Sequence, residues 1–232
     1  MIDANKENYV ICKNIIIKNM ELLKFPLHLY NKLNYSNTLK IPRSNEFVIG
    51  FSILKKTKIC IKGKNNIVVI KDMSKLYNSS IFIYGDNNTI IIGKQCYLNQ
   101  AEFYIEDTNN SIIIGDKTSI HGATHLAAIE NTNIEIGKDC MFSSDIHFRT
   151  GDSHSIIDTK GKRINPSESI IIGDHVWIGT KVTCLKGSRI QNNCVIGACS
   201  LVTKKFDESN CVLAGNPALI IRHDIDWLRK RI

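Results

Sequence analysis

The sequence has 232 residues, of which 43% are hydrophobic and 22% charged; this is enough for one folding unit and excludes a disordered, collagen-like or purely coiled-coil chain. The net charge of +8 favours an acidic ligand, with a Lys- and Asn-rich composition as the alternative explanation. No segment is apolar over the roughly 18 residues of a membrane span, no secretory signal is visible, and no basic run contains interleaved aromatic residues. We therefore expect a cytoplasmic protein that does not bind nucleic acid.

Residues 1–45 show no repeat and contain Pro26 and Pro42, so we predict that they cap the open end of the repeat structure that follows. In that structure, Asn-rich pairs precede short aliphatic runs, and they predict a tight corner because Asn tolerates left-handed backbone geometry. Equivalent isoleucines recur every 22 residues, at Ile70, Ile92, Ile114 and Ile136.

The next equivalent isoleucine, Ile172, follows Ile136 by 36 residues. The extra 36 − 22 = 14 residues predict a loop that leaves the repeat structure within 149–167. A polar loop on a regular scaffold is a favoured place for a functional site.

After the loop a period of six takes over. A large aliphatic position recurs from Ile172 to Val202, and a mostly small residue follows four positions later, from Val176 to Phe206. One large and one small residue per six suit the flat side and the tight corner of a triangular solenoid. We therefore predict an all-β parallel solenoid over 46–220, and the run resembles the hexapeptide-repeat family, which implies a left-handed parallel β-helix.

Two further expectations concern the tail and the cysteines. Apolar residues at Ile221, Ile225 and Leu228 have helical spacing, so we predict a short C-terminal helix over 221–232. The eight cysteines contain no C-x-x-C pair, so we expect reduced thiols, several at small core positions, with neither disulfides nor zinc.

The loop carries D-S-H-S-I-I and then R-I-N, followed by I-I-I-G-D-H-V-W-I-G and N-C-V-L-A-G-N-P-A. Over residues 130–225 these motifs resemble the bacterial O-acetyltransferases of capsular and lipopolysaccharide glycans. The resemblance implies acetyl-CoA as co-substrate, a glycan acceptor, and a homotrimer with coenzyme A in a groove between subunits. The net positive charge is compatible with an anionic acceptor such as a sialic acid. It also implies that His154 deprotonates the acceptor hydroxyl and that Trp177 helps to form the active site.

The chemistry suits a histidine. A neutral imidazole, with an ordinary pKa of about 6.5, can take the proton of a hydroxyl as the hydroxyl attacks a thioester. The transfer would be direct, with the oxyanion held by main-chain N–H groups. His147 is the reserve base because it points outward close by, whereas His175 is expected on the surface.

The resemblance further implies that the cofactor groove includes Trp177 together with small or polar residues and two cations that would meet its phosphates. Trp177 points outward and can also cover a neighbouring subunit. Thr203 stands where the sialic-acid enzyme of the family has an aromatic residue, and the two lysines could instead be solvated. These additional groove residues are Gly179, Thr180, Ala198, Thr203, Lys204 and Lys205.

His121 and His125 lie four residues apart, which raises the possibility of a metal site. The carbonic anhydrases built on this solenoid share three histidines across a trimer interface, but no third partner is evident here, so we expect packing and no metal. Two other functions remain open: N-acetylation of an amino-sugar nucleotide, and a non-catalytic solenoid scaffold.

Overall fold

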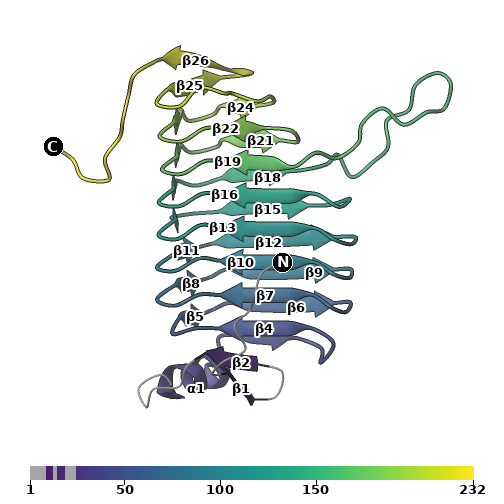
Figure 1. Ribbon diagram of the computed structural model, residues 1–232, viewed down its shortest axis with the longest axis vertical. Coiled ribbons are helices and arrows are strands. Elements are labelled where there is room, and N and C mark those ends of the chain that lie inside the picture. The colour runs from purple at the N-terminus through teal and green to yellow at the C-terminus, as the bar shows by residue number, and fades with distance from the viewer. Residues whose placement is uncertain (1–8, 13–14, 19–24) are drawn as a thin grey trace.

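The computed structural model describes residues 9–12, 15–18 and 25–232 and shows a column of stacked β-coils (Figure 1). Three largely parallel sheets form the sides of the column, and the inward side chains of all three form one continuous core. The predicted left-handed parallel β-helix is confirmed. Within the described residues no helix is long and apolar enough to cross a membrane.

Each sheet gathers every third strand along the chain, so strands of successive coils pair in register. Sheet A contains β1 (Tyr9–Cys12), β2 (Ile15–Lys18), β4 (Glu46–Ile49), β7 (Ile67–Ile70), β10 (Thr89–Ile92), β13 (Ser111–Ile114), β16 (Asn133–Ile136), β19 (Ile170–Ile172) and β22 (Arg189–Ile190). Sheet B contains β3 (Thr38–Lys40), β6 (Lys58–Lys62), β9 (Ser80–Tyr84), β12 (Ala101–Glu106), β15 (Thr124–Ala128), β18 (Ile146–Arg149), β21 (Thr183–Leu185) and β24 (Leu201–Val202). Sheet C contains β5 (Ile53–Lys55), β8 (Lys75–Tyr77), β11 (Tyr97–Asn99), β14 (Ser119–Ile120), β17 (Met141–Phe142), β20 (Trp177–Ile178), β23 (Val195–Ile196), β25 (Val212–Gly215) and β26 (Ala218–Arg222).

Both predicted periods describe the core. The isoleucines of the 22-residue period are at most 3% exposed. The positions of the six-residue period, from Val176 to Phe206, are buried as well. Cysteines fill several of the small core positions, and burial raises the pKa of Cys184 to about 12, so this thiol is inert. The side chain of Cys12 lies outside the described part of the chain.

The Asn pairs form the predicted corner, between sheets B and A. The first residue of each pair has a left-handed φ, as in Asn87 at 58°. The second is buried, and its side-chain oxygen accepts a hydrogen bond from the backbone of the next coil: Asn66 Oδ1 from Asn88 N, and Asn88 Oδ1 from Asn110 N, each at 2.9 Å. This stack of buried amides satisfies backbone groups that the corner would otherwise leave unpaired.

Within the segment predicted to be a cap, residues 1–45, β2 pairs with β4 of sheet A and β3 pairs with β6 of sheet B. Helix α1 (Phe25–Leu33) brings Asn31 to the edge of sheet C, where its side-chain oxygen accepts a hydrogen bond from Leu54 N at 2.9 Å. Asn37 Nδ2 donates to Leu54 O at 2.9 Å. The rest of the predicted cap, residues 1–8, 13–14 and 19–24, lies outside the described residues.

The predicted C-terminal helix is wrong. Strand β26 ends at Arg222, and the residues after it form no helix. Ile221 and Leu228, expected on a buried helical face, are each 64% exposed, whereas Trp227 is 6% exposed. Burying this indole against the solenoid requires an extended tail, so the packing of one aromatic residue outweighs the helical spacing.

Candidate functional site

The loop predicted within 149–167 leaves the solenoid between β18 and β19, at the corner where earlier coils carry their Asn pairs. Figure 1 shows it projecting from the column on the side opposite the C-terminal tail. His154 lies on this loop with an exposed side chain. Its imidazole is therefore accessible to a substrate hydroxyl.

Asn165 fixes the segment that carries His154. Its amide nitrogen donates to His154 O and to Asp152 Oδ2, both at 2.8 Å, and its amide oxygen accepts from Ile156 N at 2.7 Å. Asn165 is 6% exposed, so these contacts are shielded from water. The asparagine of the R-I-N motif thus ties the two strands of the loop together around His154.

Two ion pairs anchor the loop to neighbouring coils. Lys186 Nζ lies 2.5 Å from Asp152 Oδ2, and this pair, with the hydrogen bond from Asn165, holds the pKa of Asp152 below its ordinary value. Arg163 Nη2 lies 2.9 Å from the Glu130 carboxylate, and the hydrogen bonds from Arg163 and Ser167 lower the pKa of Glu130. The Asp152 carboxylate bonds Lys186 and Asn165, so it does not orient the imidazole of His154.

The structure brings four of the expected cofactor residues together at the corner between sheets C and B. Trp177 on β20 is 40% exposed, as predicted for an outward side chain. Gly179 and Thr180 follow it, and Gly179 N bonds to the next coil, at Ile196 O, which places Ala198 alongside. Thr180 Oγ1 lies 2.7 Å from Ser144 Oγ, so its hydroxyl is held by the preceding coil.

The remaining expected cofactor residues lie at a different corner. Thr203, Lys204 and Lys205 follow β24 and are exposed between sheets B and A, the corner from which the loop also leaves. Neither lysine forms an ion pair within the part of the chain that the structure describes. One chain therefore places His154 and the lysines at one corner and Trp177 at the other, with sheet B between them.

Next to Trp177 lies a contact that the sequence did not reveal. The ring of His175 stacks on Trp227 with 4.0 Å between centroids, and Trp227 also lies 6.1 Å from Trp177. The two ring nitrogens of His175 face Asp139 Oδ2 at 2.8 Å and Trp227 O at 2.9 Å. His175, expected on the surface, is instead half-buried and holds the tail beside Trp177.

The other histidines lie on different faces. His121 is exposed and packs against Tyr97 on sheet C, whereas His125 points outward from sheet B and contacts Glu102. The two do not share a ligand geometry, and no group of three metal-binding side chains occurs among the described residues. His147 points outward beside His125, with 6.1 Å between ring centroids.

This arrangement can perform general-base chemistry, because the imidazole of His154 is accessible and the main chain of that residue is fixed. The R-I-N motif is visible in the sequence, but the contacts of Asn165 and the burial of Trp227 are not. The sequence signal for Asn165 was its position in the R-I-N motif, which follows the motif that contains His154. For Trp227, the signal was an aromatic residue in a strongly charged tail, at a position that the helical spacing leaves outside its apolar face.

No family model matches the sequence. Over 95 residues it is 41% identical to the polysialic acid O-acetyltransferase of Escherichia coli O1:K1, covering 40% of this chain and 31% of that protein. Over 96 residues it is 36% identical to the polysialic acid O-acetyltransferase of Neisseria meningitidis, covering 41% of this chain and 45% of that protein. The chain thus spans less than half the length of these curated relatives.

Two solved structures match over more of the chain. The polySia-specific acetyltransferase NeuO has a TM-score of 0.75 at 36% identity, covering 81% of this chain and 79% of that one. The polysialic acid O-acetyltransferase OatWY has a TM-score of 0.54 at 33% identity, covering 85% and 90%.

Proposed function

The chain belongs to the family of left-handed β-helix acetyltransferases that includes NeuO and OatWY, and we propose that it transfers an acetyl group from acetyl-CoA to a hydroxyl of a bacterial surface glycan. The observation that carries this proposal is the accessible His154 on a loop whose main chain is fixed by Asn165. The activity of the two relatives, O-acetylation of polysialic acid, supports a capsular, anionic acceptor. The expected place of action is the cytoplasm.

His154 acts as the base. Its neutral imidazole accepts the proton of the acceptor hydroxyl, which raises the nucleophilicity of that oxygen, and the proton then leaves with the departing thiol. Acetyl-CoA, when bound, supplies the acetyl thioester. Because Asn165 holds the main chain at His154 O and Ile156 N, little reorganisation of this segment is needed before the proton moves.

The residues suit coenzyme A. An exposed indole at Trp177, with Gly179 and Ala198 beside it, offers an apolar wall next to open main chain for a long flexible thiol. Lys204 and Lys205, exposed and without ion pairs among the described residues, supply cations for phosphates.

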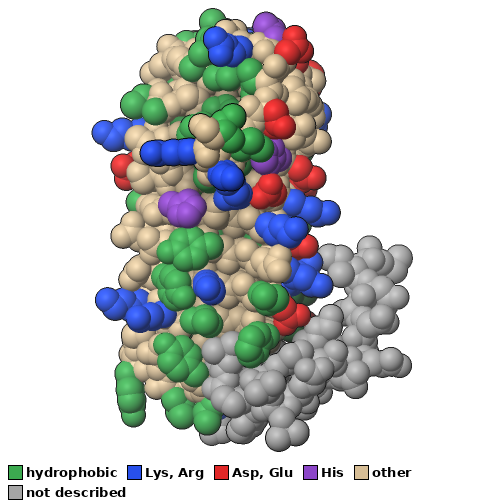
Figure 2. Space-filling view, turned by 90° about the vertical axis from the view of Figure 1, so that its left-hand side faces the viewer, with side chains coloured by type: hydrophobic (Ala, Val, Ile, Leu, Met, Phe, Trp, Pro, Cys, Tyr) green, Lys and Arg blue, Asp and Glu red, His purple; other side chains and the backbone are tan. Residues whose placement is uncertain are grey.

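These groups lie at two corners of one chain, so we propose that a complete site forms between two subunits of a homotrimer. Apolar side chains of the loop support this, since Ile156 and Ile157 are 54% and 60% exposed among the residues that the structure describes. Hydrophobic side chains also gather over the lower coils of the face in Figure 2, the side on which sheet C lies. Light scattering should give three times the chain mass of 26.2 kDa.

Incubation of the purified protein with acetyl-CoA and bacterial glycans tests the activity. We expect thiol release that depends on the glycan, and a product acetyl group that mild base removes, as for an ester. A base-stable amide formed on an amino-sugar nucleotide would instead show N-acetylation. No transfer to any acceptor, together with no thermal shift from coenzyme A, would indicate a scaffold.

A further inference from the structure

The C-terminal tail packs against the side chain that is expected to face the cofactor. Trp177 points outward from β20, and in the neighbouring coils Met141 and Val195 hold the register positions on either side of it. Trp227 lies beside the same indole, with 6.1 Å between ring centroids and 47° between the ring planes. Among the described residues, no other aromatic ring packs against Trp177. The tail therefore borders the proposed cofactor site.

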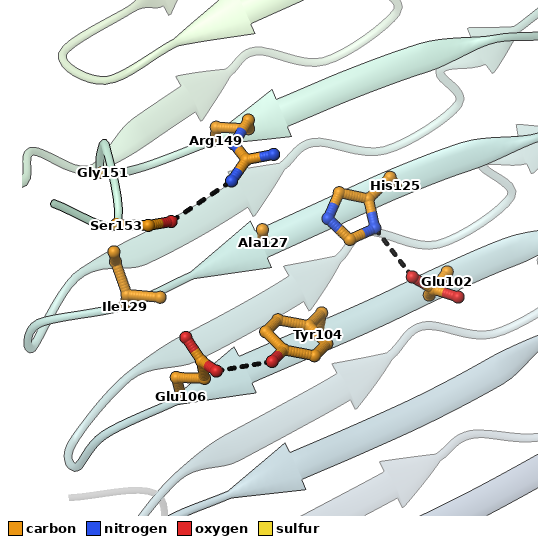
Figure 3. A pocket seen from close by; sticks show the side chains of 9 residues that line it. All are labelled: Glu102, Tyr104, Glu106, His125, Ala127, Ile129, Arg149, Gly151 and Ser153. Carbon is orange, nitrogen blue, oxygen red and sulfur yellow. Dashed lines mark hydrogen bonds and ion pairs between the residues drawn. The ribbon is translucent and has the colours of Figure 1, made fainter.

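The direction of the Trp177 side chain depends on packing. Figure 3 shows the alternative on the outward face of sheet B, where hydrogen bonds orient the side chains. There Tyr104 donates to Glu106 Oε1 at 2.5 Å, and His125 Nδ1 lies 2.9 Å from Glu102 Oε1. The 40% exposed indole of Trp177 is held by van der Waals contact instead. Two χ1 rotamers are common in a strand, so such a side chain can turn unless a neighbour prevents it.

Trp227 is itself held on several sides. Its side chain is 6% exposed, and its ring stacks on His175 with 4.0 Å between centroids and 9° between planes. Its Nε1 donates to His175 O at 2.8 Å, and its own carbonyl oxygen faces His175 Nε2 at 2.9 Å. Two hydrogen bonds and a stacked ring thus fix both the main chain and the side chain of Trp227.

Arg229 holds the tail two residues further on. Its guanidinium donates to Ser119 Oγ at 2.8 Å and to Cys140 O at 2.9 Å, on neighbouring coils. The same group lies 5.8 Å from the Trp227 ring, so it also covers the indole. These contacts fix Trp227 without any help from Trp177, which makes it a rigid support.

From this arrangement we infer that Trp227 is a positioning residue for the cofactor site, and that it keeps the Trp177 indole turned toward Gly179 and away from His175. His175 lies two residues before Trp177, at the corner between sheets A and C, and Trp227 fills the space beside that corner. Gly179 lies at the other corner and has no side chain. A rigid ring on one side and open main chain on the other direct the indole into the groove.

This inference rests on the proposed function, because the direction of Trp177 matters only where coenzyme A meets it. A side chain that shares its time among several orientations binds a ligand more weakly, in proportion to the time spent in the competent one. With about three χ1 wells and two ring orientations, loss of the support should weaken coenzyme A binding about three- to sixfold. Bound cofactor orders the indole again, so KM for acetyl-CoA should change more than kcat.

The composition makes the test direct, because the sequence contains two tryptophans, Trp177 and Trp227. Trp227→Phe keeps an aromatic ring in the tail and Trp227→Ala removes it, and in both variants Trp177 is the sole indole fluorophore. Time-resolved fluorescence anisotropy reports the motion of Trp177, and calorimetry with coenzyme A reports the affinity. We expect a more mobile Trp177 and about three- to sixfold weaker binding in the Ala variant, with near wild-type affinity in the Phe variant.

A double variant separates positioning from general damage to the fold. In a Trp177→Ala background, Trp227→Ala should cost no further affinity, because the side chain through which it acts is gone. Leu228→Ala is the matched control, since it changes a 64% exposed neighbour in the same tail and should leave the affinity unchanged. Thermal unfolding of each variant checks that the solenoid is intact.

Equal mobility of Trp177 in the Phe and Ala variants, or equal affinity of the two for coenzyme A, would overturn the inference. A further loss of affinity in the double variant would also overturn it, because Trp227 would then act by another route. If coenzyme A binds as expected but no acetyl group is transferred, the proposed function fails and the role of Trp227 stands. No binding of coenzyme A by the wild type would overturn both.

Discussion

The excursion loop and the C-terminal tail both leave the regular coils, yet they reach opposite states. The loop projects from the column (Figure 1), and its apolar side chains, such as Ile157 at 60% exposure, are not covered by the described residues. The tail returns to the solenoid and buries Trp227 to 6% exposure. The difference lies in one indole: the tail also leaves Leu228 64% exposed, but Trp227 fastens it to the solenoid, whereas no buried aromatic side chain holds the loop within the described residues.

The hydrogen bonds that hold the two segments differ in how far they reach along the sequence. In the loop, Asn165 connects residues that lie close in sequence, so the loop holds its own shape while standing away from the core. In the tail, Arg229 reaches Ser119 Oγ at 2.8 Å and Asp139 Oδ1 at 3.0 Å, which belong to distant coils. The tail is therefore shaped by the surface on which it lies.

The largest expected effect is a loss of activity from a substitution in the loop that does not alter the tail. His154→Ala should lower kcat about a hundredfold or more, the scale typical of general acid–base catalysis, with no change in oligomeric state. His147→Ala is the control and should cost much less. Steady-state kinetics compares the two, and equal losses would remove His154 from its role as base.

The next effect tests whether the loop holds its own shape. Asn165→Ala should lower kcat by about tenfold or more, since it leaves buried polar groups of the loop without partners. The unfolding temperature should barely change because the loop lies outside the core. Thr159→Ala, an exposed change on the same loop, is the control; equal activity of both variants would show that Asn165 does not position His154.

A smaller effect concerns the cations at the loop's corner. Replacing Lys204 and Lys205 by Ala should raise KM for acetyl-CoA about two- to thirtyfold and leave kcat nearly intact, because exposed pairs contribute roughly 0.2–1 kcal/mol each. The effect should shrink as salt is added. Lys71→Ala with Lys94→Ala removes the same charge elsewhere, and an equal rise in KM there would make the effect non-specific.

The smallest effect tests the tail. Burial alone would raise the pKa of Asp139, but hydrogen bonds from His175 and Arg229 hold it below its ordinary value. A carboxylate with a lowered pKa stabilises the fold above its ordinary range, near pH 4, and this contribution is lost as the pH falls through the lowered value. The wild type should unfold about 2–4 °C above Asp139→Asn at neutral pH, with the gap closing in acid. A gap that is constant with pH would exclude this titration.

The sequence predicts the coils well because each inward position repeats the same local requirement. Ile114 and Ile136 occupy equivalent places, so the pattern of one coil predicts the position of the next. The loop's position also follows from the interruption of this period, and His154 from its motif. Contacts between distant segments carry no such repetition: Trp227 and His175 lie 52 residues apart, and nothing in the local spacing indicates their stacking.

The residues of the candidate site also fall into those that the sequence period locates and those that it does not. The residues near Trp177 follow the six-residue period, which fixes their corner. The ion pair of Asp152 with Lys186 joins two neighbouring coils, and this cross-strand relation appears only when the register is known. The histidine motif can therefore be read from the sequence, whereas side-chain relations between neighbouring coils cannot.

The stack of buried asparagines gives the molecule a modular length. Asn66, Asn88 and Asn110 make the same bond to the coil that follows, and the strands around them pair in the same register. Removing or inserting one complete 22-residue unit would rejoin equivalent positions and leave the loop's own coil intact. Evolution or a designer can thus lengthen or shorten this column in whole steps, independently of the chemistry at its upper end.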